Sequence, residues 1–233
     1  RDLMGIENYR TARTTSANVA GDAYINDYSG NLVLQRPLVS EAGVTISYVY
    51  NSRYGDMAFT SSSPVYHTVD YSNMLSAVGW RLSVQQSVVT KNLTLAGVNM
   101  EYLIYTDGDG TEHWFVPIGE NRWRDEDGLN LVATREGSRV TIIDLDGNKK
   151  IFIHGYLWSL EDINENKVFL LYDTKDFSIT AEPKSSSAGS KNCLSRILYR
   201  SASCATIVVA DFEYTNSYLS AIIDRNGDKT TMT

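Results

Sequence analysis

The chain has 233 residues, of which 42% are hydrophobic and 21% charged, and this composition fits an ordered globular protein with a buried core rather than a disordered chain. The net charge is -7 and the basic residues are scattered, so no nucleic-acid partner is expected. The longest apolar runs, such as residues 205–210, are too short to cross a bilayer, and membrane insertion is not expected either.

Alternation at the strand period, with many Val, Ile, Thr and Tyr residues, marks most of the chain. In chain order, strands are predicted from Val44 ("VTISYVYNS"), Trp80 ("WRLSVQQSVV"), Glu101 ("EYLIYT"), Ser138 ("SRVTIID") and Ala205 ("ATIVVADFEY"). The best helical candidate is one short segment at residues 74–78. Loops are predicted at residues 61–64 and 182–191, the latter a flexible Ser-rich insertion inside a continuing sheet. The expected fold class is all-β, with consecutive antiparallel hairpins forming a curved sheet.

Two internal repeats support a hairpin unit that is used several times. The pattern D-x-D-G occurs at residues 107–110, 125–128 and 144–147, and the first and third copies continue to match as far as Phe115 and Phe152. A longer repeat relates "YLWSLEDINENK" from Tyr156 to "YLSAIIDRNGDK" from Tyr218. Both copies predict an apolar strand, an Asp/Asn/Gly turn and a second strand, seen after the first copy as "KVFLLYD".

The D-x-D-G copies raise the question of calcium, because oxygen ligands two residues apart in a tight turn suit a hard cation. None of the copies supplies the full ligand set of an EF-hand loop. The segment from Asp224 to Lys229 comes nearer, with oxygens at Asp224, Asn226 and Asp228, but Lys229 stands where that loop needs Gly. Hairpin-turn chemistry, in which Asp side chains accept backbone N–H groups and Gly takes a positive φ, is the favoured interpretation, and no metal site is predicted.

No catalytic or cofactor-binding residue is predicted. The three histidines have no metal-ligand spacing and are expected to be exposed strand or turn residues: His67, His113 and His154. Two carboxylate pairs would suit a glycosidase only if the fold brought their members face to face: Glu161 with Asp162, and Asp125 with Asp127. Cys193 and Cys204 lack a zinc-type partner cluster, and either a disulfide or two buried free thiols is compatible with their spacing.

The aromatic residues allow two interpretations. A sugar-stacking face and ordinary core or cross-strand packing are both possible for eight of them, with packing favoured: Trp80, Trp114, Trp123, Trp158, Tyr48, Tyr50, Tyr66 and Tyr71.

The order of several motifs resembles bacterial RHS/YD-repeat proteins of the wall-associated and polymorphic-toxin type. "GIENYR", "DYSGNLVLQRPLVS", "VTISYVYNSR" and "VGWRLSV" resemble the opening of that family's conserved region, with Asn26, Gly30 to Leu32, Tyr50 to Ser52 and Gly79 to Trp80 at the motif positions. Ala77 and Val78 depart from the pattern, where the family usually has another Gly. Downstream, "YTDGDGTEHWF", "IIDLDGNKKIF" and "GYLWSLEDINENKVFLLYD" resemble its later strands and YD repeats, with Tyr172 and Asp173 as the name-giving pair. Glu165 and Asp228 are departures from the repeat.

The resemblance implies one β region over residues 1–233, with family-specific strands in 1–100 and YD-like hairpins in 101–233. It also implies a non-enzymatic segment of a large secreted or cell-surface protein, whose hairpins build a β shell that encloses or displays a C-terminal effector. The partners would be the remainder of the parent chain and its enclosed C-terminal domain. The alternative hypothesis is a cell-surface glycan-binding module, and a glycosidase is a distant third.

Overall fold

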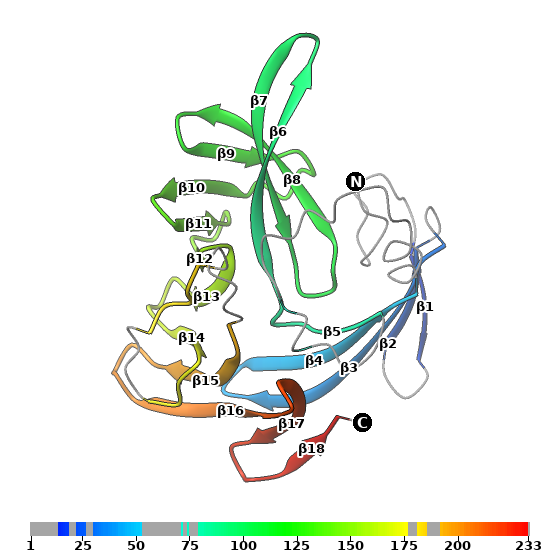
Figure 1. Cartoon of the computed structure of the whole chain (residues 1–233), viewed down its shortest axis with the longest axis vertical. Helices are drawn as coiled ribbons and strands as arrows, with labels where there is room; N and C mark the ends of the chain where they lie inside the picture. The colour runs from blue at the N-terminus through cyan, green and yellow to red at the C-terminus, as the bar shows by residue number, and fades with distance from the viewer. Residues whose placement is uncertain are drawn as a thin grey trace.

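The computed structural model describes residues 14–18, 22–26, 30–52, 71, 74, 79–176, 181–185 and 192–232. Within these ranges the chain forms eighteen β-strands in two antiparallel sheets and no α-helix (Figure 1). The expected all-β class and the antiparallel arrangement are therefore confirmed.

The smaller sheet has five strands in the order in which they occur along the chain, and it curves beside the rest of the molecule (Figure 1). Its members are β1 (Thr14–Asn18), β2 (Asp22–Asn26), β3 (Leu32–Glu41), β4 (Val44–Asn51) and β5 (Trp80–Leu82). A two-residue turn joins β3 to β4, and both of its residues, Ala42 and Gly43, have positive φ. This is the turn geometry that matches the twist of a tight hairpin.

The larger sheet has thirteen strands. They are β6 (Ser87–Leu95), β7 (Val98–Thr106), β8 (Glu112–Gly119), β9 (Arg122–Asp125), β10 (Val132–Glu136), β11 (Arg139–Ile143), β12 (Lys149–Ile153), β13 (Tyr156–Glu161), β14 (Lys167–Tyr172), β15 (Leu194–Arg200), β16 (Thr206–Thr215), β17 (Tyr218–Asp224) and β18 (Lys229–Thr231).

Eight of these strands, β6 to β13, close into a barrel. Each strand pairs with the next in the chain, and the barrel closes where Tyr156 of β13 pairs with Ser87 of β6. Strands β14 to β18 continue from β13 as further hairpins outside the barrel, and β16 approaches β3 of the smaller sheet (Figure 1). One hydrophobic core extends through the smaller sheet, the barrel and strands β14 to β18. It includes Ile46 of β4, Phe115 of β8 and Phe212 of β16.

The predicted strands are found, with one correction. "WRLSVQQSVV" is not a single strand, because β5 ends at Leu82, β6 begins at Ser87, and the two belong to different sheets. The N–H of Gln85 donates to the carbonyl of Leu82 (2.9 Å), and the Gln85 side chain accepts the N–H of Leu82. These bonds turn the chain from one sheet to the other. The predicted loop at residues 61–64, residues 75–78 of the predicted helix and residues 186–191 of the predicted insertion lie outside the described residues, while residues 182–185 belong to no strand.

The repeated turns share one hydrogen-bond pattern. In each, the first residue donates its N–H to the carbonyl of the fifth, and the fourth donates to the first; the turns begin at Asp107, Asp144, Asp162, Ser201 and Asp224. The fourth residue always has positive φ, and it is Gly110, Gly147, Glu165, Cys204 or Gly227. The turn interpretation of the first and third D-x-D-G copies is thus confirmed. The second copy differs, because Asp125 donates its N–H to Leu131, six residues on, and closes a wider loop.

Candidate functional site

The first D-x-D-G turn, between β7 and β8, packs directly against the smaller sheet and its link to the barrel. A Cβ atom on Gly108 would lie 2.7 Å from the carbonyl oxygen of Ser83, so only glycine fits there without moving backbone. On the same turn, the carbonyl of Asp109 accepts a hydrogen bond from Nδ2 of Asn51 (2.8 Å), at the end of β4. The turn therefore joins the barrel to the smaller sheet.

Asn51 also forms hydrogen bonds with the neighbouring motifs. Its Oδ1 accepts a hydrogen bond from Nδ2 of Asn31 (2.8 Å), and its backbone N–H donates to the carbonyl of Gly79 (2.8 Å). Gly79 has a φ of 86°, and a Cβ there would lie 2.7 Å from the ring of Tyr50. Beside them, Ser52 Oγ accepts the N–H of Leu32 (2.9 Å). The motifs at residues 30–32, 50–52 and 79–80 thus meet at one place, which we term the buried junction together with the turn at residues 107–110.

Next to the junction, His113 on β8 lies between two carboxylates. Its Nε2 is 3.1 Å from Oδ2 of Asp107, its Nδ1 is 3.0 Å from Oδ2 of Asp127, and its side chain is only 5% exposed. Burial opposes a charge on the ring, but the hydrogen bonds with Asp107 and Asp127 outweigh it and raise the pKa of His113 to about 9. The expectation that His113 is an exposed strand residue is wrong, because these two aspartates compensate its burial.

The two aspartates of the turn differ in ionisation. Oδ1 of Asp107 accepts the backbone N–H groups of Asp109, Gly110 and Thr111 at 3.0–3.1 Å. Burial raises the pKa of Asp107, but the hydrogen bond from His113 and the other donors outweigh burial and lower it. The pKa of Asp109 is raised to about 7, mainly by burial and next by the negative charge of Asp107. Thr111 donates both its N–H (2.9 Å) and its hydroxyl (2.6 Å) to Asp109 Oδ1.

Asp127 reaches His113 from the wider loop between β9 and β10. The side chain is 5% exposed, and its second oxygen, Oδ1, has no hydrogen-bond partner within the described part of the chain. Asp125, the other member of this predicted carboxylate pair, accepts the N–H groups of Leu129 (2.8 Å) and Leu131 instead. The two carboxylates therefore serve different partners and do not form an acid–base pair.

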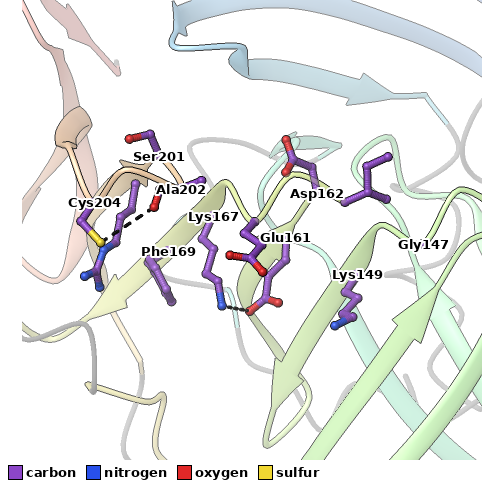
Figure 2. Close-up of a pocket in the computed structure, with 12 residues that line it drawn as sticks. Gly147, Lys149, Glu161, Asp162, Lys167, Phe169, Ser201, Ala202 and Cys204 are labelled. Atoms are coloured by element: carbon purple, nitrogen blue, oxygen red, sulfur yellow. Dashed lines mark hydrogen bonds and ion pairs between the residues drawn. The ribbon is translucent and has the colours of Figure 1, made fainter.

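The second predicted pair is also divided. Glu161 forms an ion pair with Lys167 across the β13–β14 hairpin (3.1 Å), and Asp162 accepts the N–H groups of Asn164 (2.8 Å) and Asn166 (2.9 Å) in the turn. Both residues line an open hollow together with turns that include Gly147 and Ala202 (Figure 2). The volume of this hollow is about 780 Å³. Glu161 and Asp162 therefore stabilise the β13–β14 hairpin.

The remaining single candidates have ordinary positions. His154 is an exposed turn residue with a φ of 51°, as expected, and His67 lies outside the described residues. No disulfide joins Cys193 and Cys204, and neither is fully buried: Cys193 is half-buried, and Cys204 is exposed at the hollow in Figure 2. Among the described residues, no group of three or more His, Cys, Asp or Glu side chains could hold a metal ion.

Of the eight candidate aromatic residues, three are buried, four are half-buried, and Tyr66 lies outside the described residues. Trp114, Trp123 and Trp158 are buried, with 7%, 2% and 9% of their surface exposed. Trp80 is half-buried and stacks on Tyr48, with ring centroids 4.4 Å apart, and the centroid of the Tyr50 ring lies 5.1 Å from that of Trp80. Packing is thus the role of the three buried tryptophans, and a partly exposed aromatic group remains on β4 and β5.

Comparison with known proteins adds no identification. No protein-family model matches the chain, and no curated protein is significantly similar to it. No helix among the described residues is long and apolar enough to cross a membrane.

Sequence reasoning missed the Asp107–His113–Asp127 cluster. His113 is isolated in a strand, and its partners lie 6 and 14 residues away in two separate turns. One signal could have indicated it: both partners belong to D-x-D-G copies, at the first position of one and the third of the next. Consecutive antiparallel hairpins bring alternate turns to the same end of a barrel, so these two turns become neighbours.

Proposed function

We propose that this chain is a non-enzymatic structural segment of a large secreted or cell-surface protein of the RHS/YD-repeat type. In this proposal its hairpins form part of the wall of a β shell that encloses or displays a C-terminal effector. The observation that carries the proposal is the buried junction, because Asn31, Asn51 and Gly79 of the family-like motifs are buried there and bind one another. Asn51 alone connects Asn31, Gly79 and Asp109.

The Tyr–Asp pair has the same structural character. Tyr172, at the end of β14, is buried and donates its hydroxyl to the carbonyl of Leu157 on β13 (2.8 Å). Asp173 exchanges hydrogen bonds with Cys193, just before β15: its N–H donates to the Cys193 carbonyl (2.8 Å), and its Oδ1 accepts the Cys193 N–H (3.0 Å). One dipeptide thus fastens three successive strands, which suits a wall made of repeated hairpins.

The chemistry of His113 supports a non-enzymatic role. A histidine that acts as a general base needs one ring nitrogen directed at the group that it deprotonates. Both nitrogens of His113 bind carboxylates, and its raised pKa keeps it protonated at neutral pH. The cluster therefore behaves as a buried ion pair that stabilises two turns.

A shell wall also needs strands on which it can continue. Strand β18 pairs only with β17 among the described strands, so its other edge can accept a strand from the remainder of the parent chain. Reading the parent coding sequence on both sides of these residues tests the proposal. Many further Tyr–Asp hairpins followed by an unrelated C-terminal region would support it. A stop codon shortly after Thr233 would reject it.

The alternative, a glycan-binding module, is favoured by one observation, the half-buried stack of Trp80 with Tyr48 and Tyr50. Rings of this kind can stack on sugars. A glycan array combined with tryptophan fluorescence tests it: a binder would give a saturable signal that Trp80→Leu abolishes. A structural segment would give none, and its fluorescence would remain blue-shifted, as expected for the buried Trp114 and Trp158.

A further inference from the structure

A cavity of about 300 Å³ lies at one end of the barrel. It is bounded by the end of β7, the start of β8, the wide β9–β10 loop and the β11–β12 hairpin, and its apolar lining includes Leu129, Leu131 and Ile142. Its volume is at the lower end of the range for small-molecule sites, which combine apolar walls with a few polar groups. Ile142 is buried and Leu129 is 42% exposed, so the cavity extends from the core to the surface.

Lys150 is the polar group of the cavity that can bind a further partner. Its Nζ donates one hydrogen bond to the hydroxyl of Tyr105 (2.6 Å), and that hydroxyl donates onward to Oε1 of Gln86 (2.7 Å). An ammonium group carries three donors, so two remain without a partner among the described residues. Burial lowers the pKa of Lys150, and the charges of Asp107 and Asp144 act against that decrease. A ligand anion would therefore find a desolvated, incompletely bonded ammonium.

The other charged groups at the cavity already have partners. Asp107 binds His113 through Oδ2 and three backbone N–H groups through Oδ1. Asp144 accepts hydrogen bonds from the N–H and Nδ2 of Asn148, both at 2.9 Å. Both ring nitrogens of His113 are engaged. Lys150 is thus the charged lining group with donors to offer.

We propose that this cavity binds a small monocarboxylate with a short apolar chain. The carboxylate accepts hydrogen bonds from Lys150, and the chain lies against Leu129, Leu131 and Ile142. This site is independent of the structural role proposed above. It would hold in a shell segment and in a self-contained protein alike.

Titration of the whole chain with hexanoate by calorimetry tests the proposal, with hexanol and hexylamine as probes of the same apolar length. Hexanoate is expected to bind at millimolar or lower concentration, and hexanol about tenfold more weakly, because it lacks the charge that Lys150 pairs with. Lys150→Met keeps the length of the side chain but removes the charge, and it should weaken hexanoate binding about tenfold or more. Lys149→Met, at an exposed position on the same strand, is the matched control and should leave it unchanged.

Three results would overturn the proposal: no saturable hexanoate binding, equal binding to Lys150→Met, or binding of hexylamine as tight as that of hexanoate. The last result would mean that Asp107 and Asp144 dominate the cavity. If Lys150→Met fails to fold, NMR of the unmodified chain decides. Hexanoate must then shift the Lys150 ε-methylene signal and raise the pKa of Lys150, and an unchanged signal would refute the site.

Discussion

Asn51 and Asp109 are 58 residues apart in sequence, yet Nδ2 of Asn51 donates a 2.8 Å hydrogen bond to the carbonyl of Asp109. Asn51 ends β4 in the five-stranded sheet, and Asp109 lies in the β7–β8 turn of the barrel. The bond is partly buried, and Asn51 itself is only 2% exposed. It therefore couples the two sheets at the position where the motif residues meet.

Replacing Asn51 with Ala should destabilise the protein strongly. The variant loses hydrogen bonds to Asn31 and Asp109 inside a buried region, which costs roughly 2–4 kcal/mol in the free energy of unfolding. Urea denaturation measures this free energy. Asn99→Ala is the control, because Asn99 is an exposed strand residue on β7, and it should change stability by less than about 0.5 kcal/mol. Equal effects of the two variants would contradict the coupling role of Asn51.

Gly108→Ala tests the close approach of the turn to the β5–β6 link. The added Cβ would meet the backbone oxygen of Ser83 at 2.7 Å, and because backbone cannot rotate away, the expected loss is about 1–3 kcal/mol in unfolding free energy. Gly119 also has an ordinary φ, but a Cβ added there would have no neighbour within 4 Å, so Gly119→Ala should be nearly neutral. Thermal unfolding of the two variants side by side gives the difference. A neutral Gly108→Ala would mean that the turn is not held against Ser83.

His113 makes stability depend on pH above neutrality. Its folded-state pKa of about 9 exceeds the unfolded value of 6.5, so its contribution is complete below pH 6.5 and is lost as the pH rises through 9. Each tenfold change in proton affinity is about 1.4 kcal/mol, so the contribution is about 3 kcal/mol. Denaturation at several pH values measures the loss, and His113→Gln should remove it. The exposed His154 is the control, and His154→Asn should leave the pH dependence intact.

Asp109 makes stability depend on pH below neutrality. Its folded-state pKa of about 7 lies above the ordinary 3.8, so the folded protein favours the protonated acid, and this contribution is lost as the pH rises from 4 to 7. Asn resembles the protonated acid in shape and carries no charge. Asp109→Asn should therefore stabilise the protein by about 1–2 kcal/mol at pH 8 and have little effect at pH 4. Destabilisation at pH 8 would indicate that the charge of Asp109 is needed.

Glu165 occupies a turn position where three of the equivalent residues are glycine. Its φ is 65°, which is strained for a residue with a Cβ, so Glu165→Gly should stabilise the protein by about 0.5–1 kcal/mol. The opposite change, Gly227→Ala, adds a Cβ to open space at a φ of 88° and should cost a similar amount. Melting temperatures of the two variants should move in opposite directions. If both melting temperatures moved in the same direction, the positive φ would not be what makes glycine favourable at this turn position.

The hairpins could be predicted from sequence because their signals are local. Asp107, Asp144 and Asp224 begin turns in which an Asp oxygen accepts nearby N–H groups and a Gly three residues later takes the positive φ. The turn from Ser201 to Ala205 has the same backbone but was missed, since Ser201 and Cys204 replace the Asp and Gly of the pattern. Local chemistry therefore predicts most turns, and fails where other residues adopt the same conformation.

Closure of the barrel could not be predicted, because it depends on non-local pairing. Ser87 and Tyr156 pair across 69 residues, and nothing in either segment identifies the other. The break between β5 and β6, where the chain leaves one sheet for the other, could not be predicted for a related reason. Residues 80–89 alternate like one strand, and the break comes from the Gln85 side chain, which binds the N–H of Leu82.

Cryo-electron microscopy of the parent protein tests the central claim most directly. The proposal predicts that the free edge of β18 pairs with the next strand of the same chain, and that residues 14–232 form part of a continuous hairpin wall around an enclosed space. A parent protein in which this segment stands apart, with β18 unpaired and no enclosing wall, would contradict it.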